Sequence, residues 1–64
     1  MENVKLLNLL KKMAKYDKYF LYILKRLNQM NDKAQEHFFQ DILSYNVRSE
    51  YDILTYFKGW RLAV

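Results

Sequence analysis

The residues that could carry out catalysis are few in this sequence. His37 is the only histidine, there is no cysteine, and the only serines are Ser44 and Ser49. On a helix, His37 and Ser44 would share a face but lie about 10 Å apart along the axis. That separation is too long for a histidine to activate a nucleophilic hydroxyl. We therefore expect no catalytic residues and no enzyme.

Metal and ligand sites are equally poorly supplied. Glu36, His37 and Asp41 form a small cluster of acidic residues and histidine, which we interpret as a solvated helix surface. A structural zinc site normally needs four cysteine or histidine ligands. The single glycine, Gly59, excludes a glycine-rich phosphate loop. A chain of 64 residues also has little room for a ligand pocket of the usual volume. We expect no metal, no cofactor and no small-molecule substrate.

Basic residues are concentrated in the first half of the chain. Residues 1–31 contain seven lysine or arginine residues against two carboxylates, whereas residues 32–64 contain four against five. The seven are Lys5, Lys11, Lys12, Lys15, Lys18, Lys25 and Arg26. Such a surface can neutralise nucleic-acid phosphates, and Tyr22 near it could stack on a base. The alternative is a solvated face that keeps the protein soluble.

Aromatic residues are frequent in the second half and predict an interface. Tyr45, Tyr56, Trp60 and Arg61 are of the types that are enriched in protein interfaces. We expect these four residues to contact a partner protein. The alternative for Trp60 is that it folds back onto the core of its own chain.

A heptad pattern predicts one long helix over residues 3–30. Apolar or aromatic residues recur at alternate spacings of three and four, at Leu6, Leu9, Met13, Tyr16, Phe20, Ile23, Leu27 and Met30. No proline or glycine interrupts this stretch. Leu7, Leu10, Leu21 and Leu24 widen the apolar face beyond the stripe of a strict coiled coil.

Two shorter helices are predicted in the second half, over about 33–45 and about 50–58. Asn31 and Asp32 are typical helix N-caps, and with Asp32 as the cap Gln35 takes the capping-box position. Ser49 followed by Asp52 resembles a second capping box, and Gly59 is a natural C-terminal stop. Alternatively, residues 46–49 stay helical and the two segments form one long helix.

The whole chain, residues 1–64, is thus expected to be a single all-α domain. We predict a small helical bundle, in which the long N-terminal helix packs antiparallel against one bent or two shorter helices. A core this small is marginal in stability, so we also expect a homodimer to complete it. The longest apolar run is far shorter than a membrane span, and residues 1–13 do not resemble a signal peptide. We expect a cytoplasmic protein without a transmembrane segment.

Two further interpretations of the predicted helices each conflict with one feature of the sequence. Residues 36–58 have the outline of a helix-turn-helix, but the reading helix would present Glu50 and Asp52 to phosphates. The predicted first helix is also amphipathic and lysine-rich, like helices that lie on membrane surfaces. Its apolar face, however, has the second half of the chain to pack against.

The segment Leu27-Asn28-Gln29-Met30-Asn31-Asp32 resembles the turn of Rop-type plasmid proteins. The resemblance covers about a dozen residues. It implies a helical hairpin that dimerises into a four-helix bundle and binds paired RNA loops. The polar face of residues 3–30 does not match that family, so none of its RNA-binding residues is transferred.

The sequence therefore favours a small non-enzymatic regulatory protein that binds a macromolecule. Nucleic acid held by the lysine-rich face is the leading interpretation. The alternative is a protein-binding inhibitor, adaptor or structural subunit that uses the aromatic second half.

Overall fold

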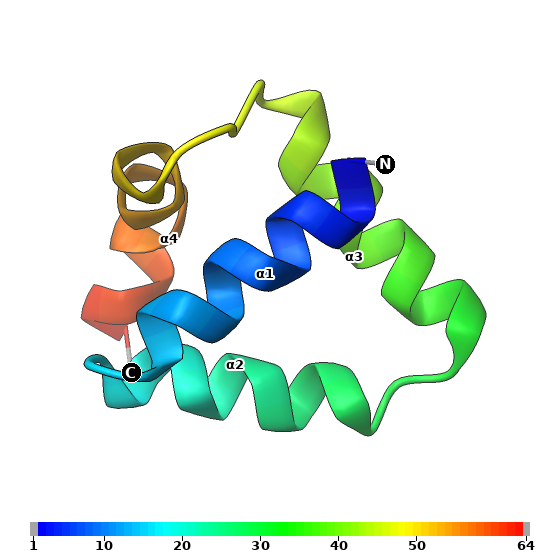
Figure 1. Ribbon diagram of the computed structural model, residues 1–64, viewed down its shortest axis with the longest axis horizontal. Helices are drawn as coiled ribbons and strands as arrows, with labels where there is room; N and C mark the ends of the chain where they lie inside the picture. Colours follow the sequence, from blue (N-terminus) through cyan, green and yellow to red (C-terminus); the bar gives the residue numbers. More distant parts are fainter. Residues whose placement is uncertain (1, 64) are drawn as a thin grey trace.

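Four helices make up the protein in the computed structural model, which describes the backbone of residues 2–63 and the side chains of residues 2–59. They are α1 (Glu2–Ala14), α2 (Lys18–Asn28), α3 (Asp32–Ser44) and α4 (Glu50–Ala63). In Figure 1, α1 crosses the middle of the molecule, with α2 below it, α3 to the right and α4 to the left. The described residues contain no strand.

The predicted helix over residues 3–30 is wrong, because the chain turns between α1 and α2. Asp17 has extended backbone angles (φ −134°, ψ 112°), and its carboxylate accepts a hydrogen bond from the Tyr19 amide at 3.0 Å. Asp17 is therefore the N-cap of α2, which satisfies an amide that has no partner within the helix. The heptad pattern continues through the turn and conceals it.

Folding back allows the broad apolar faces of α1 and α2 to cover each other. A helix over residues 3–30 would extend about 40 Å, whereas the longest dimension of the fold is 26 Å. Every seventh residue of the predicted seam is buried, at Leu6, Met13, Phe20 and Leu27. Leu9, Ile23 and Met30 are half-buried, and Tyr16 lies in the turn with 65% of its surface exposed.

The start of α3 differs by one residue from the sequence prediction. Asn31 rather than Asp32 is the N-cap, and its side-chain oxygen accepts from the Ala34 amide at 2.8 Å. Gln35 is not part of a capping box. Its side-chain nitrogen, Nε2, donates to the carbonyl oxygens of Leu27 and Met30, at 3.0 and 3.2 Å. Gln35 thereby fixes the end of α2 against the first turn of α3.

Residues 45–49 separate α3 from α4. Asn46 has a φ of 59°, a left-handed conformation that asparagine tolerates better than most residues. Ser49 and Asp52 then form the reciprocal bonds of a capping box, at 3.2 Å in each direction. Helix α4 does not stop at Gly59 as predicted but continues to Ala63, and Gly59 has no positive φ.

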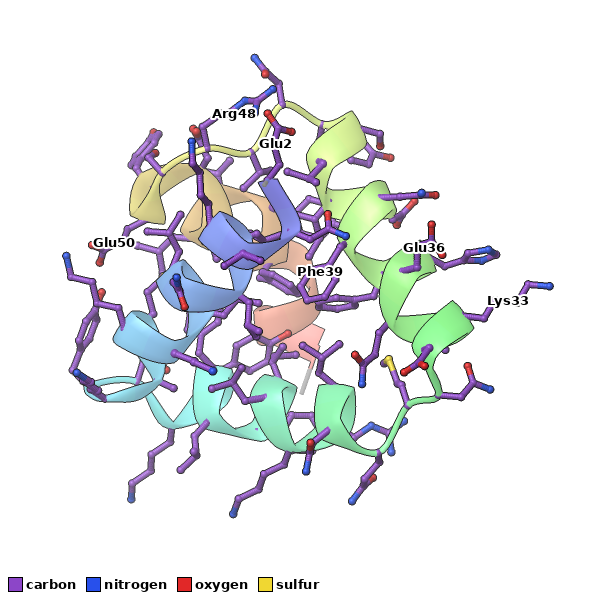
Figure 2. All side chains as sticks on the ribbon, turned by 45° about the vertical axis from the view of Figure 1, so that its right-hand side comes forward. Glu2, Lys33, Glu36, Phe39, Arg48 and Glu50 are labelled. Carbon is purple, nitrogen blue, oxygen red and sulfur yellow. The ribbon has the colours of Figure 1, made fainter. Side chains whose placement is uncertain are left out.

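The core draws on all four helices and is rich in aromatic rings. Its buried side chains are Leu6, Leu10, Met13, Phe20, Leu27, Phe39, Ile42, Val47, Ile53 and Phe57. Phe57 of α4 meets Phe20 of α2 edge to face, with ring centroids 5.7 Å apart, and also contacts Tyr56 and Phe38. In Figure 2, Phe39 points from α3 into the space enclosed by the helices. This aromatic cluster joins the second half of the chain to the first.

The fold is all-α, but its helices number four over residues 2–63 instead of the two or three that were predicted. It is not the two-helix hairpin that the resemblance to Rop-type proteins implied. A homodimer was predicted because a core of this size is marginal in stability. The homodimer stays a prediction. None of the described helices is long and apolar enough to cross a membrane.

Candidate nucleic-acid interface

All seven basic residues singled out in the sequence are exposed to solvent. Lys5, Lys11 and Lys12 belong to α1, Lys15 to the turn, and Lys18, Lys25 and Arg26 to α2. Because the chain folds back after Ala14, the seven residues occupy two helices instead of one continuous face. The turn therefore decides which of them lie close together.

Two lysines, one from each helix, line the same hollow, and two more flank the turn between α1 and α2. Lys11 and Lys25 line the same hollow of about 360 Å³, whose wall also includes Leu7 and Asn28. Lys15 and Lys18 flank the turn that joins the two helices. We call these four residues, Lys11, Lys15, Lys18 and Lys25, the lysine patch.

Tyr22 lies within the outline of the lysine patch. Lys18, Tyr22 and Lys25 are spaced four and three residues apart, which places them on one face of α2. The Tyr22 side chain is 51% exposed. An aromatic ring thus accompanies the ammonium groups on the same helix face, as the sequence suggested.

Carboxylates are scarce around the lysine patch. Helix α2 contains no acidic residue, and α1 contains only Glu2, at its opposite end. Within the described part of the chain, no ion pair involves a lysine of the patch. Asp17 is the nearest acidic residue in the sequence, and its side chain caps α2. The patch therefore presents positive charge that the described carboxylates do not offset by direct pairing.

Lys12 faces a different neighbour. Its ammonium group lies 3.1 Å from a carboxylate oxygen of Glu50 at the start of α4. The Tyr16 hydroxyl donates a hydrogen bond to the other oxygen of the same carboxylate. The hydrogen bond from Tyr16, and then the one from Lys12, hold the pKa of Glu50 below its usual value. Lys12 therefore helps to hold α4 against α1.

Lys5 and Arg26 complete the seven basic residues. Lys5 lines a separate hollow together with Glu2 and Arg48, and these two form an ion pair that Figure 2 shows beside the start of α1. Arg26 follows Lys25 directly, so it projects about 100° further around α2. The structure thus places Lys11 and Lys25 at one hollow and gives Lys12 and Lys5 acidic neighbours, so the seven residues do not form one continuous face.

The start of α4 is occupied by contacts within the protein. Arg48 pairs with Glu2, Glu50 with Lys12, and the Asp52 carboxylate accepts from the amides of Arg48 and Ser49. These contacts orient the helix on α1. The same residues would be the base-reading positions of a helix-turn-helix, so the arrangement does not favour that motif.

Capping by Asp52 predicts a loss of stability in acid. The hydrogen bond from the Arg48 amide is the main cause that lowers the pKa of Asp52 below its ordinary 3.8. A lowered folded-state pKa contributes stability that is complete above the unfolded pKa and is lost as the pH falls through the folded value. We expect the urea midpoint to fall as the pH drops below about 4.

The variant Asp52→Asn tests this assignment. It should have a lower urea midpoint than the wild type at neutral pH, and the difference should narrow in acid, where the wild-type carboxylate is also uncharged. Ser49→Ala is the matched control, because it removes the other half of the capping box but keeps the carboxylate. Its pH dependence should resemble that of the wild type. An Asp52→Asn protein with the full acid response would show that other carboxylates cause it.

The aromatic residues predicted for a protein interface are only partly described. Tyr45 is 69% exposed, whereas Tyr56 is half-buried and donates its hydroxyl to Asp41 Oδ2 at 3.1 Å. The side chains of Trp60 and Arg61 lie outside the described residues. The sequence prediction missed Tyr51, which is 76% exposed. The signal was present, since Tyr51 lies on the side of α4 opposite the buried Ile53 and Phe57.

The two residues considered above for nucleophilic catalysis are surface residues of α3. His37 and Ser44 are both exposed, and the Ser44 hydroxyl donates to the Asp41 carbonyl at 2.6 Å. Among the described residues, no three histidine or carboxylate side chains are placed to hold a metal ion. Comparison with protein-family models, with curated proteins and with solved structures found no match to this chain.

Proposed function

We propose that the protein binds nucleic acid through phosphate contacts made by the lysine patch. One observation supports the proposal above all. Four exposed lysines belong to α1, α2 and the turn that joins them, two of them line one hollow, and no described carboxylate forms an ion pair with any of the four. Lysines bind phosphate as point charges, and releasing the counterions around the phosphates supplies the affinity. Such binding depends on salt and not on sequence.

Tyr22 extends the proposal from phosphates to bases. Its exposed ring lies between Lys18 and Lys25 along α2. A ring in this position can stack on an unpaired base while the flanking lysines hold the phosphates on either side. The proposal therefore favours nucleic acid with unpaired or looped nucleotides over a regular duplex.

A salt series measures the number of phosphate contacts. For four contacts, the logarithm of the affinity should fall with the logarithm of the salt concentration with a slope of about −3 for single strands and about −4 for duplex. We would measure binding to fluorescently labelled single-stranded RNA and to duplex DNA by anisotropy. Absence of binding to either at about 50 mM salt would contradict the proposal.

Matched neutral substitutions separate the patch from net charge. Lys11→Gln with Lys25→Gln removes two charges of the patch and should reduce the steepness of the salt slope by about 2. Lys33→Gln with Lys58→Gln removes two charges from exposed positions on α3 and α4 and should leave the slope nearly unchanged. Equal loss in both double variants would mean that overall charge, and not the patch, drives binding.

The second candidate function is protein binding by the aromatic second half. It is favoured by the exposure of Tyr45 and Tyr51, which the core does not use. A cytoplasmic location and a homodimer are compatible with either function and stay predictions.

A further inference from the structure

A hollow on the opposite half of the molecule is lined by tyrosines and carboxylates. It has a volume of about 570 Å³ and lies between the end of α3, the connecting segment and the first turns of α4. Its described lining residues are Asp41, Tyr45, Val47, Tyr51, Asp52, Thr55 and Tyr56. It shares no described residue with the lysine patch, so its role is independent of the nucleic-acid proposal and rests on the second candidate function, protein binding by the aromatic second half.

Three aromatic rings surround this hollow. Tyr45 and Tyr56 meet edge to face, with their centroids 5.5 Å apart and their planes inclined at 63°. Tyr51 comes from the first turn of α4, and Val47, only 4% exposed, contributes buried apolar surface. Tyr45 and Tyr51 thus expose large ring areas to solvent at a place where neither ring is needed to fill the core.

Each carboxylate of the hollow accepts hydrogen bonds through one of its two oxygen atoms. Asp41 Oδ2 accepts from the Tyr56 hydroxyl, and Asp52 Oδ2 accepts from the amides of Arg48 and Ser49. Neither Oδ1 atom has a hydrogen-bond partner among the described residues. Burial, and then the bond to Asp41, raise the pKa of Tyr56 to about 12, so its phenol stays protonated and keeps donating. The Asp41 carboxylate is held in place by this bond.

No lysine or arginine is among the described residues that line the hollow, although the chain contains eleven. The site therefore combines aromatic faces, fixed negative charge and two unused acceptor atoms. A cation gains from all three features, because its charge attracts both the carboxylates and the electron-rich ring faces. An anion or a nucleic-acid backbone would be repelled.

We propose that this hollow binds an arginine side chain presented by a partner polypeptide. A guanidinium group is planar and stacks on tyrosine rings while its N–H groups donate to carboxylate oxygens. A quaternary ammonium ion has no N–H and would leave the Oδ1 acceptors unpaired. The hollow is also open to solvent, which suits the end of a long side chain on a larger partner. An arginine side chain therefore suits both the tyrosine rings and the carboxylates of the hollow.

The experiment compares two short peptides by NMR with the full chain. The probes are acetyl-Gly-Arg-Gly-amide and the same peptide with citrulline, which keeps the shape of arginine but carries no charge. We expect the arginine peptide to shift the signals of Tyr45, Tyr51 and Thr55, with a dissociation constant in roughly the millimolar range. The citrulline peptide should cause much smaller shifts.

Two pairs of variants locate the binding site. Tyr51→Ala and Asp41→Asn should each lower the affinity for the arginine peptide by about two- to fivefold. Tyr22→Ala removes an exposed tyrosine outside the hollow, and Glu36→Gln removes an exposed carboxylate of α3, so neither should change binding. Asparagine at position 41 retains an acceptor for Tyr56, which protects the fold of the test variant.

Three results would overturn the proposal. The first is equal binding of the arginine and citrulline peptides, which would show that charge is not recognised. The second is tighter binding of tetramethylammonium chloride than of the arginine peptide, which would make the site a quaternary-ammonium site. The third is unchanged binding in Tyr51→Ala. Each result leaves the nucleic-acid proposal untouched, since the lysine patch lies on other helices.

Discussion

Phe20→Ala is expected to leave most of the protein unfolded at 25 °C. The Phe20 side chain is completely buried at the start of α2, with Tyr19 and Phe57 packed edge to face against it at 5.3 and 5.7 Å. Truncating a buried phenylalanine costs about 3–5 kcal/mol. A core of this size supplies only about 3–5 kcal/mol of net stability. The loss therefore matches the entire stability of the fold.

Far-UV circular dichroism and urea unfolding would measure the effect. Phe20→Leu keeps more of the volume and should stay folded with a reduced urea midpoint, so that a free-energy difference can be measured. Tyr22→Ala is the matched control two residues away, because Tyr22 is half exposed and should cost within about 0.5 kcal/mol. A Phe20→Ala protein with the wild-type midpoint would contradict the aromatic core described for α2 and α4.

The local signals of the sequence identified where the helices of the second half begin, α3 to within one residue. The pattern at Ser49 and Asp52 reflects two hydrogen bonds between neighbouring residues, so it depends little on the rest of the chain. The N-cap signal at Asn31 is also local, although the sequence offered Asp32 beside it as an equally good N-cap. Gly59 was misleading for the opposite reason. A glycine ends a helix only where the chain adopts a left-handed conformation, and at Gly59 it does not.

The turn at Tyr16 and Asp17 could not be found from periodicity. The apolar spacing runs through it without a gap, and neither residue is a glycine or a proline. What decides between one long helix and two short ones is the area that each arrangement buries. Folding back lets Leu10 and Met13 of α1 become fully buried within the chain. That gain arises from contacts between helices, which a one-dimensional pattern does not contain.

The same turn explains why the candidate site was only partly predicted. The residue types alone placed the seven lysine and arginine residues on the surface, and all seven side chains are exposed. The way these residues are grouped depends on the fold. Lys12 pairs with Glu50, and Lys5 lines a hollow with Glu2. Lys11 of α1 and Lys25 of α2 line another hollow together. The tyrosine-lined hollow was missed, because Tyr45, just after α3, and Tyr51, in α4, come to line the same hollow only through the turn at Asn46.

Reversing the charge of three patch lysines is expected to abolish nucleic-acid binding. In the variant with Lys11→Glu, Lys15→Glu and Lys18→Glu, three phosphate contacts are lost and three repulsions are added. At about 50 mM salt each lysine–phosphate contact contributes roughly tenfold to the affinity through counterion release, so the loss should be about a thousandfold or more. All three side chains are exposed, so the circular dichroism spectrum should not change.

The control variant reverses the charge of three other lysines. Lys5→Glu, Lys33→Glu and Lys58→Glu change the formal net charge by the same amount at exposed positions outside the lysine patch. Long-range repulsion weakens both variants, but it is screened beyond about 10 Å at 0.1 M salt. The difference in affinity between the control and the wild type at the same salt should therefore narrow as salt is raised toward that level, whereas the patch variant should stay much weaker than the wild type. If the two variants bind equally weakly at every salt concentration, the lysine patch is not a binding site. The protein then acts on nucleic acid, if at all, only through its net charge.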